Sequence, residues 1–281
     1  MNPSPEPAEG AGRTRPIGVF DSGIGGLTVV SALRELLPNE RIFYLGDTAR
    51  VPYGGKSAAT VERYSLEIAA MLLEEDCKTI VVACNTASAL ALPRLEETSP
   101  VPVTGVIRPG AEAAVAATRN GHIGVIGTRA TIKSGAYERA IEVLDPAFRV
   151  TARACPLFVP LIEEGWIEGG ITDQIVRQYL EPLVEQGIDT LVLGCTHYPL
   201  LRAAIGRFLG DAVTLVDSAQ NCATAVAQLL EAEELDAPSQ AEGKLAVALT
   251  DPPDAFLEVA RKALRLDIGT VQLRQVIHAV R

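Results

Sequence analysis

Short apolar runs alternate along the chain with segments of helical periodicity. Eight runs rich in β-forming residues stand out: PIGVF (16–20), RIFYL (41–45), TIVVA (79–83), VPVTGV (101–106), HIGVIG (122–127), TLVLG (190–194), VTLVD (213–217) and KLAVAL (244–249). Between them, apolar residues near helical spacing predict helices over Leu27–Leu37, ended by Pro38, and over Thr60–Glu75. Strands that are apolar throughout are typical of sheets covered on both faces, so the pattern predicts a doubly wound parallel α/β fold.

Polar and glycine-rich segments follow the first three runs directly. DSGIGGLTVV begins at Asp21, GDTARVPYGGKS begins at Gly46, and Cys84, Asn85 and Thr86 follow the third run. Ligands of such sheets bind beyond the carboxyl ends of the strands, so we expect these segments to crowd one edge. The string GGKS is not a phosphate-binding loop, because Arg50 stands where that loop needs a glycine.

Length and charge narrow the class of protein. A chain of 281 residues with 48% hydrophobic content can form one large or two smaller α/β domains. With 25 basic against 35 acidic residues and a net charge of −10, nucleic acid is not expected as the main ligand. No apolar run is long enough for a membrane span, and residues 1–16 resemble a disordered tail rather than a secretory signal. These features predict a cytoplasmic protein without membrane contact.

The cysteines and histidines do not form a disulfide framework or a metal site. The five cysteines are scattered without a CxxC pair, and the three histidines are never at metal-ligand spacing from a cysteine. We interpret Cys77, Cys155 and Cys222 as buried structural residues, which is the usual fate of a free cysteine. Cys84 and Cys195 differ from them because each follows an apolar run and precedes a predicted helix start.

A weak internal duplication relates these two cysteines. From Gly18 in PIGVFDS to Gly124 in HIGVIGT is 106 positions, and from Cys84 in TIVVACNTAS to Cys195 in TLVLGCTHYP is 111. Parallel strands resemble one another by composition, but the matched cysteines favour two copies of one unit. The sequence therefore predicts two similar domains related by a pseudo-twofold axis, with one cysteine on each side of a shared cleft.

A thiol on each face of a substrate suits the inversion of a stereocentre. One base removes a proton from one side while an acid delivers a proton from the other, and the reverse reaction exchanges their roles. The pKa of a free cysteine is about 8.5 and falls near a helix N-terminus or a positive charge, so one thiol and one thiolate can coexist near neutral pH.

Four strings in order resemble the glutamate racemases of the aspartate/glutamate racemase superfamily: IGVFDSGIGGLTV, YLGDTARVPYGGKS, VVACNTASA and LVLGCTHYPLL. The resemblance runs from about Ile17 to about Ser218. It implies a cofactor-independent homodimeric enzyme that interconverts L- and D-glutamate and supplies the D-isomer for peptidoglycan. It also implies a first domain of residues 17–106 plus 220–281 and a second domain of residues 107–219.

The resemblance assigns roles to particular residues. The catalytic cysteines fall on Cys84 and Cys195, and the assisting residues on Asp21 and His197. The substrate contacts fall on Asp21, Ser22, Tyr53, Gly54, Asn85, Thr86, Thr196 and His197. PLIEEGW resembles a segment with an assisting glutamate, which would be Glu163, and the duplication adds Thr128 as the counterpart of Ser22. Arg108 in GVIRPGA departs from relatives near the expected crossing between domains, where it would affect hinge or dimer contacts.

The residues themselves agree with a pocket for an amino acid. Neutral hydroxyl and amide groups, with backbone N–H groups at helix starts, suit carboxylate and ammonium groups without adding charge beside the thiols. No lysine has a persuasive setting for a pyridoxal phosphate Schiff base; those considered are Lys56, Lys78, Lys133, Lys244 and Lys262. Two alternatives stay open at this point: a racemase of another acidic amino acid such as aspartate, and a non-enzymatic binding protein that keeps the fold.

Overall fold

Two parallel sheets organise the chain in this computed structural model, which describes residues 12–252, 257–258, 261 and 264–276. The first sheet has the order β10-β9-β2-β1-β3-β4. Its strands are β1 (Ile17–Asp21), β2 (Ile42–Gly46), β3 (Thr79–Val82), β4 (Val103–Gly105), β9 (Leu245–Leu249) and β10 (Val271–Leu273). The second has the order β6-β5-β7-β8, with β5 (His122–Gly127), β6 (Arg149–Ala154), β7 (Thr190–Gly194) and β8 (Thr214–Asp217). Every strand pair is parallel, which confirms the predicted fold class.

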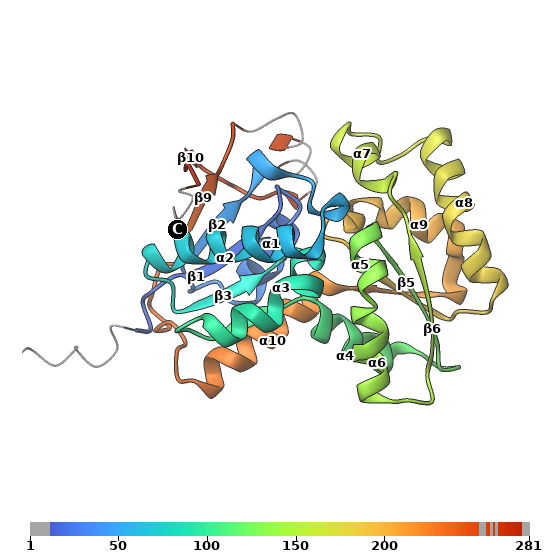
Figure 1. The fold of residues 1–281 in the computed structure, drawn as a ribbon, viewed down its shortest axis with the longest axis horizontal. Helices are drawn as coiled ribbons and strands as arrows, with labels where there is room; N and C mark the ends of the chain where they lie inside the picture. The colour runs from blue at the N-terminus through green and yellow to red at the C-terminus, as the bar shows by residue number, and fades with distance from the viewer. Residues whose placement is uncertain (1–11, 253–256, 259–260, 262–263, 277–281) are drawn as a thin grey trace, which may run out of the picture.

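The two sheets repeat one arrangement. The strand orders β2-β1-β3-β4 and β6-β5-β7-β8 correspond strand for strand, with Cys84 after β3 and Cys195 after β7. Figure 1 shows the sheets side by side, with the late strand β9 (red) beside β2 (blue) and β10 on the far side of β9. We call the six-stranded sheet with its helices the first lobe and the four-stranded sheet with its helices the second lobe. The repeated order supports the duplication read from the sequence, and the domain boundaries near residues 106 and 219 stay a prediction.

The eight apolar runs all form strands, and the strands that the sequence analysis missed are β6 and β10. Both lie at sheet edges, where β6 has the polar sequence RVTARA and β10 spans three residues. The residues of β6 are exposed or only partly buried and β10 is short, so neither has the continuous apolar run of a strand covered on both faces.

Helices cover the sheets. They are α1 (Leu27–Leu36), α2 (Ala58–Glu74), α3 (Asn85–Thr98), α4 (Ile107–Ala117), α5 (Arg129–Ser134), α6 (Ala136–Leu144), α7 (Phe158–Glu163), α8 (Gly170–Glu185), α9 (Arg202–Leu209) and α10 (Ser218–Ala232). The two helices predicted from periodicity are α1 and α2, each within two residues of its predicted ends. Among the residues that the structure describes, no helix is long and apolar enough to cross a membrane.

The period of two along each strand divides the core of the first lobe into two layers. Ile17 and Val19 of β1 face a layer shared with α1 and α10, whereas Phe20 faces a layer shared with α2 and α3. The first layer continues into the second lobe through residues such as Val106 and Cys195. The lobes are therefore joined by a common core and not only by two chain crossings.

Lys78 ties three distant segments together just before β3. Its side chain is fully buried, and its Nζ lies 2.6 Å from Glu40 Oε2. The same Nζ donates hydrogen bonds to the carbonyl oxygens of Arg13 at 2.8 Å and Leu235 at 2.7 Å.

Residues 1–11 of the predicted disordered tail lie outside the described residues, and so does Lys262.

Replacing Lys78 with methionine is expected to lower the free energy of unfolding by about 3–5 kcal/mol, because the Glu40 carboxylate would stay buried without its counter-charge. Urea denaturation measures the change. The control is Lys244→Met, whose partner Glu242 is exposed, with an expected change below about 1 kcal/mol. Equal losses in the two variants would contradict this interpretation of Lys78.

Candidate active site

The carboxyl ends of the two sheets face one cavity. Its volume is about 30 Å³, which is room for one or two water molecules. Of the site residues predicted from the sequence, ten line it: Ser22, Tyr53, Gly54, Cys84, Asn85, Thr86, Thr128, Cys195, Thr196 and His197. Asp21 and Glu163 do not line it. The sequence analysis did not single out the three apolar residues that complete the lining, Val51, Pro52 and Val159.

Cys84 supplies the thiol of the first lobe. It is the N-cap residue of α3, it is 5% exposed, and its Sγ lies 3.7 Å from Ser22 Oγ. Burial raises the pKa of Cys84 to about 12, and the nearby charge of Asp21 contributes to the rise. The Cys84 side chain is therefore a protonated thiol at neutral pH.

Asp21 is held at the end of β1 by its own loop. Its Oδ2 accepts hydrogen bonds from the backbone N–H groups of Gly23 at 3.2 Å and Gly26 at 3.1 Å. Its Oδ1 is buried and has no hydrogen-bond partner among the described residues. The loop thus uses one oxygen of the Asp21 carboxylate, and the charge of this carboxylate acts on Cys84.

Cys195 supplies the thiol of the second lobe and has a different neighbour. Its Sγ lies 3.9 Å from Nδ1 of His197, whose Nε2 lies 3.4 Å from Glu163 Oε1. Burial alone would lower the pKa of His197, but the contacts with Cys195 and Glu163 outweigh it and raise that pKa to about 10. The imidazole is therefore positively charged at neutral pH, and a positive charge at this distance stabilises a thiolate on Cys195.

Gly25 of the first lobe lets His197 approach. A Cβ atom added at Gly25 would lie 2.5 Å from His197 Nδ1 and 2.6 Å from Thr196 Oγ1. Any larger residue would displace the imidazole from Cys195. The glycine-rich stretch after β1 therefore has two roles. Its backbone N–H groups hold the Asp21 carboxylate, and its lack of side chains leaves room for His197 of the second lobe.

Threonine hydroxyls join the lobes at the cavity. Thr86 Oγ1 lies 3.0 Å from Thr128 Oγ1 and 3.2 Å from Thr131 Oγ1. Thr128 caps the N-terminus of α5, and a Cβ atom added at Gly54 would lie 2.7 Å from Thr128 Cβ. The position of Thr128 inferred from the duplication is thus in the cavity wall.

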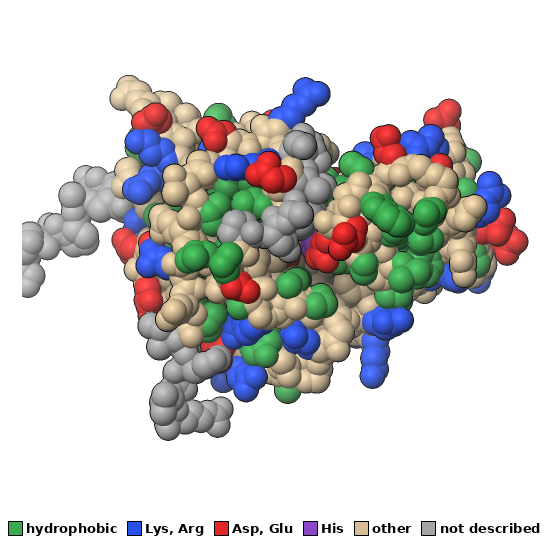
Figure 2. All heavy atoms as spheres, turned by 90° about the horizontal axis from the view of Figure 1, so that it is seen from above, with side chains coloured by type: hydrophobic (Ala, Val, Ile, Leu, Met, Phe, Trp, Pro, Cys, Tyr) green, Lys and Arg blue, Asp and Glu red, His purple; other side chains and the backbone are tan. Residues whose placement is uncertain are grey.

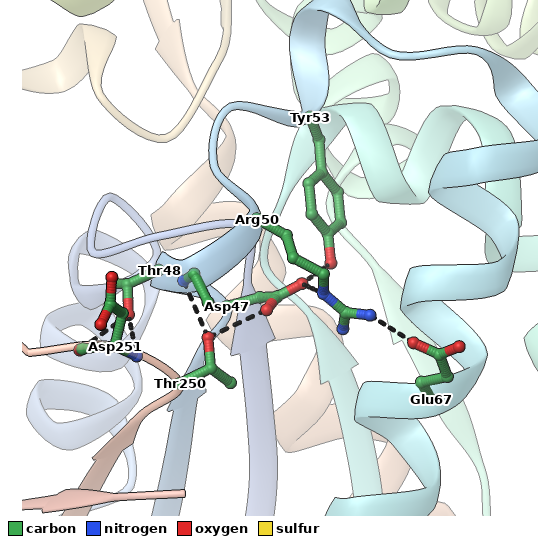
Figure 3. A network of polar contacts seen from close by, with 8 residues as sticks. Asp47, Thr48, Arg50, Tyr53, Glu67, Thr250 and Asp251 are labelled. Atoms are coloured by element: carbon green, nitrogen blue, oxygen red, sulfur yellow. Dashed lines mark hydrogen bonds and ion pairs between the residues drawn. The ribbon is translucent and has the colours of Figure 1, made fainter. Parts of the chain in front are cut away.

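A buried network holds the loop that carries Tyr53 and Gly54 (Figure 3). Asp47 Oδ2 accepts hydrogen bonds from Arg50 Nε at 2.7 Å and from the Tyr53 hydroxyl, and Oδ1 accepts one from Thr250 Oγ1 at 3.0 Å. Arg50 also pairs with Glu67 of α2. Since its hydroxyl is engaged with Asp47, Tyr53 presents other atoms to the cavity.

Asp47 and Thr250 escaped the sequence analysis, although both follow a strand of the first sheet. Thr250 comes directly after β9, and its Oγ1 also accepts a hydrogen bond from the Ala49 N–H at 2.9 Å. Ligands of such sheets bind beyond the carboxyl ends of the strands, and both residues occupy such positions. What the sequence could not show was that β9 lies beside β2.

A second cavity of about 200 Å³ adjoins the first and shares Pro52, Gly54, Thr128 and Val159 with it. Glu163 lines this outer cavity. Figure 2 shows hydrophobic side chains gathered on the second lobe next to acidic ones near the junction of the lobes. Within the described ranges, no group of three or more His, Cys, Asp or Glu side chains is placed to hold a metal ion.

Comparisons with known proteins agree with this geometry. Residues 24–226 match the model of the family described as Asp/Glu/Hydantoin racemase. A glutamate racemase of Geobacter metallireducens is 52% identical over 91% of this chain and 94% of its own. The crystal structure of the Thermus thermophilus glutamate racemase with beta-chloro-D-alanine has a TM-score of 0.84 at 47% identity and covers 94% of this chain and 98% of its own. That of the Francisella tularensis glutamate racemase with D-glutamate has a TM-score of 0.88 at 37% identity, with the same coverage of 94% and 98%.

The two cavity thiols are expected to differ in reactivity. At pH 7.5 iodoacetamide should modify Cys195 at least about tenfold faster than Cys84, because the thiolate is the nucleophile and only Cys195 has a cationic neighbour. The two are 6% and 5% exposed, so access alone does not predict this difference. Mass spectrometry of the digested protein measures both rates.

The variant His197→Asn serves as the control, since it removes the positive charge and should slow Cys195 towards the rate of Cys84. In the wild type, the advantage of Cys195 should shrink as the pH rises through about 10, where His197 loses its proton. Equal rates at pH 7.5, or no effect of the histidine variant, would refute the assigned asymmetry.

Proposed function

The chain belongs to the Asp/Glu/hydantoin racemase family, and from that premise we propose that it interconverts L- and D-glutamate by proton transfer between Cys84 and Cys195. The observation that carries the mechanism is the single cavity lined by one cysteine from the strand ends of each lobe. Inversion at the α-carbon needs an acid and a base on opposite faces of the substrate. A thiol from each lobe supplies that arrangement.

The neighbours of the two thiols set the starting protonation state. In the proposed cycle Cys195 reacts as the thiolate beside the His197 imidazolium, and Cys84 reacts as the thiol. The Cys195 thiolate removes the α-proton of a substrate that presents its C–H bond to the second lobe, and the bonding electron pair stays on the α-carbon and its carboxylate. The Cys84 thiol delivers its proton to the opposite face and becomes the thiolate. The reverse reaction exchanges the roles of the two sulfurs.

Charged residues outside the cavity lining assist each thiol. Glu163 contributes to the raised pKa of His197 and so supports the ion pair with Cys195. Asp21 raises the pKa of Cys84, which keeps this side chain protonated before transfer and makes its thiolate a strong base for the reverse direction. Asp21 and Glu163 are therefore positioning residues for proton transfer.

Neutral groups bind the substrate. The hydroxyls of Ser22, Thr86 and Thr196 and the amide of Asn85 line the cavity, and the first N–H groups of α3 follow Cys84. Hydrogen bonds from such groups stabilise the charge that develops on the carboxylate when the α-proton leaves. The small volume of the cavity supports a cycle in which the lobes open for binding and close for chemistry.

Further properties follow from the resemblance to glutamate racemases. We propose that the enzyme acts in the cytoplasm without a cofactor and supplies D-glutamate for peptidoglycan. Aspartate is the competing substrate, and the test below includes it. A non-enzymatic binding role is disfavoured because both thiols line one cavity.

The first test is exchange of the α-proton of L- and D-glutamate in D₂O. The wild type should incorporate deuterium with inversion, and Cys84→Ser and Cys195→Ser should each lose racemisation by about 10²-fold or more, because a serine hydroxyl is a far weaker acid than a thiol. Residual exchange in the two variants should have opposite directional bias. Nuclear magnetic resonance measures the exchange.

The matched control for this test is Cys77→Ser, a buried cysteine outside the cavity, which should keep its activity. Exchange with aspartate but not with glutamate would reassign the substrate. Absence of exchange with both would remove the enzymatic function and leave a binding protein.

We also propose a homodimer, which the resemblance supports. Light scattering of the purified protein should give about twice the chain mass of 29.8 kDa. A mass equal to one chain at micromolar concentration would refute the dimer. The proposed racemase function does not depend on this result.

A further inference from the structure

Tyr137 of α6 lies outside the cavity lining but contacts a residue that belongs to it. Its hydroxyl donates a hydrogen bond of 2.7 Å to Asn85 Oδ1. Asn85 is the first residue of α3 and is 2% exposed. The contact joins the second lobe to the first, since α6 packs in the second lobe and α3 in the first.

The other end of the Asn85 amide has no partner. Its Nδ2 is buried and makes no hydrogen bond with the described residues. A buried donor left without an acceptor costs free energy, so a group of this kind points to a ligand or water that completes it. Because Asn85 lines the cavity and its Oδ1 is engaged by Tyr137, Nδ2 is the end that the cavity can use.

Ser218 is a second polar partner of the Tyr137 hydroxyl. A hydrogen bond from Ser218, the first residue of α10, opposes the large rise that burial causes in the pKa of Tyr137. Because the one O–H of Tyr137 donates to Asn85 Oδ1, the phenol oxygen accepts in its contact with Ser218. In this orientation Asn85 Oδ1, the Tyr137 hydroxyl and Ser218 form one chain of hydrogen bonds, and Asn85 Nδ2 is left without a partner among the described residues.

The Tyr137 ring is held on two sides by glycines. A Cβ atom added at Gly110 of α4 would lie 3.3 Å from the Tyr137 hydroxyl oxygen, and one added at Gly194 would lie 3.1 Å from Cε2. Tyr137 is 1% exposed. The ring is thus confined between α4 and the end of the strand that precedes Cys195.

We propose that Tyr137 is a positioning residue that fixes the Asn85 amide with Nδ2 towards the substrate, where it donates to a carboxylate oxygen. This assignment rests on the proposed racemase function. A neutral donor suits that place, because it binds an anion without adding a charge beside Cys84. Tyr137 also makes this donor depend on the relative placement of the lobes, since the tyrosine and the asparagine come from different ones.

The test is Tyr137→Phe, which removes one oxygen atom and keeps the ring. We expect KM for both glutamate enantiomers to rise about tenfold, with kcat changed less than about threefold, because the lost interaction is made in the ground state and the transition state alike. Thermal unfolding of each variant confirms that it is folded. An unchanged KM in folded Tyr137→Phe overturns the proposal.

A double-mutant cycle with Asn85→Ala shows whether Tyr137 acts through the amide. Adding Tyr137→Phe to Asn85→Ala should raise KM no further, since there is no amide left to orient. Additive effects on KM overturn the proposal. Ser218→Ala is a second variant that leaves the tyrosine in place; it should give a smaller rise in KM of the same kind, and an unchanged KM there counts against the assigned direction of the hydrogen bonds.

Tyr198→Phe is the matched control, because it deletes a buried tyrosine hydroxyl that donates to the Cys155 carbonyl oxygen at 2.9 Å. Its stability should fall, and its KM should stay near that of the wild type. An equal rise in KM would attribute the effect to the loss of any buried hydroxyl and overturn the proposal. Wild-type protein without α-proton exchange on glutamate would instead refute the proposed function itself, so the two failures are distinguishable.

Discussion

Burial of two thiols in one cavity is the constraint on which the rest of the site depends. A buried thiolate is costly unless a positive charge lies beside it, and a buried thiol keeps its proton when a negative charge lies near. Cys195 has the His197 imidazolium as its neighbour, and Cys84 has the Asp21 carboxylate. Because little water separates these groups, single neighbours suffice to give two chemically identical side chains opposite roles.

The repeated strand order explains why the two thiols have similar positions, and unlike neighbours in the two lobes explain their difference. At the offset of 106 positions Asp21 corresponds to Gly127, and at the offset of 111 His197 corresponds to Thr86. Neither charged neighbour therefore has a counterpart in the other copy. Two similar lobes place the sulfurs on either side of the cavity, and unlike residues beside them set the direction of the first proton transfer.

Local patterns predicted much of this structure, and long-range contacts account for what they did not. Central strands were found because they are apolar throughout, and the cavity residues because they follow such strands. The edge strand β6 has no such run. Tyr137 is the second residue of the amphipathic helix α6, and its contact with Asn85 spans 52 positions, so no local signal marks it. The bond between Asp47 and Thr250 likewise depends on which strands become neighbours.

The hydrogen bond between Asp47 and Thr250 joins residues 203 positions apart. It connects the loop that follows β2 to the residue that follows β9, and these two strands are paired. A ribosome makes the loop that bears Tyr53 and Gly54 long before it makes β9. Until that strand emerges and pairs with β2, the carboxylate of Asp47 lacks its contact with Thr250. The contact between Asp47 and Thr250 can therefore form only after the whole second lobe has been synthesised.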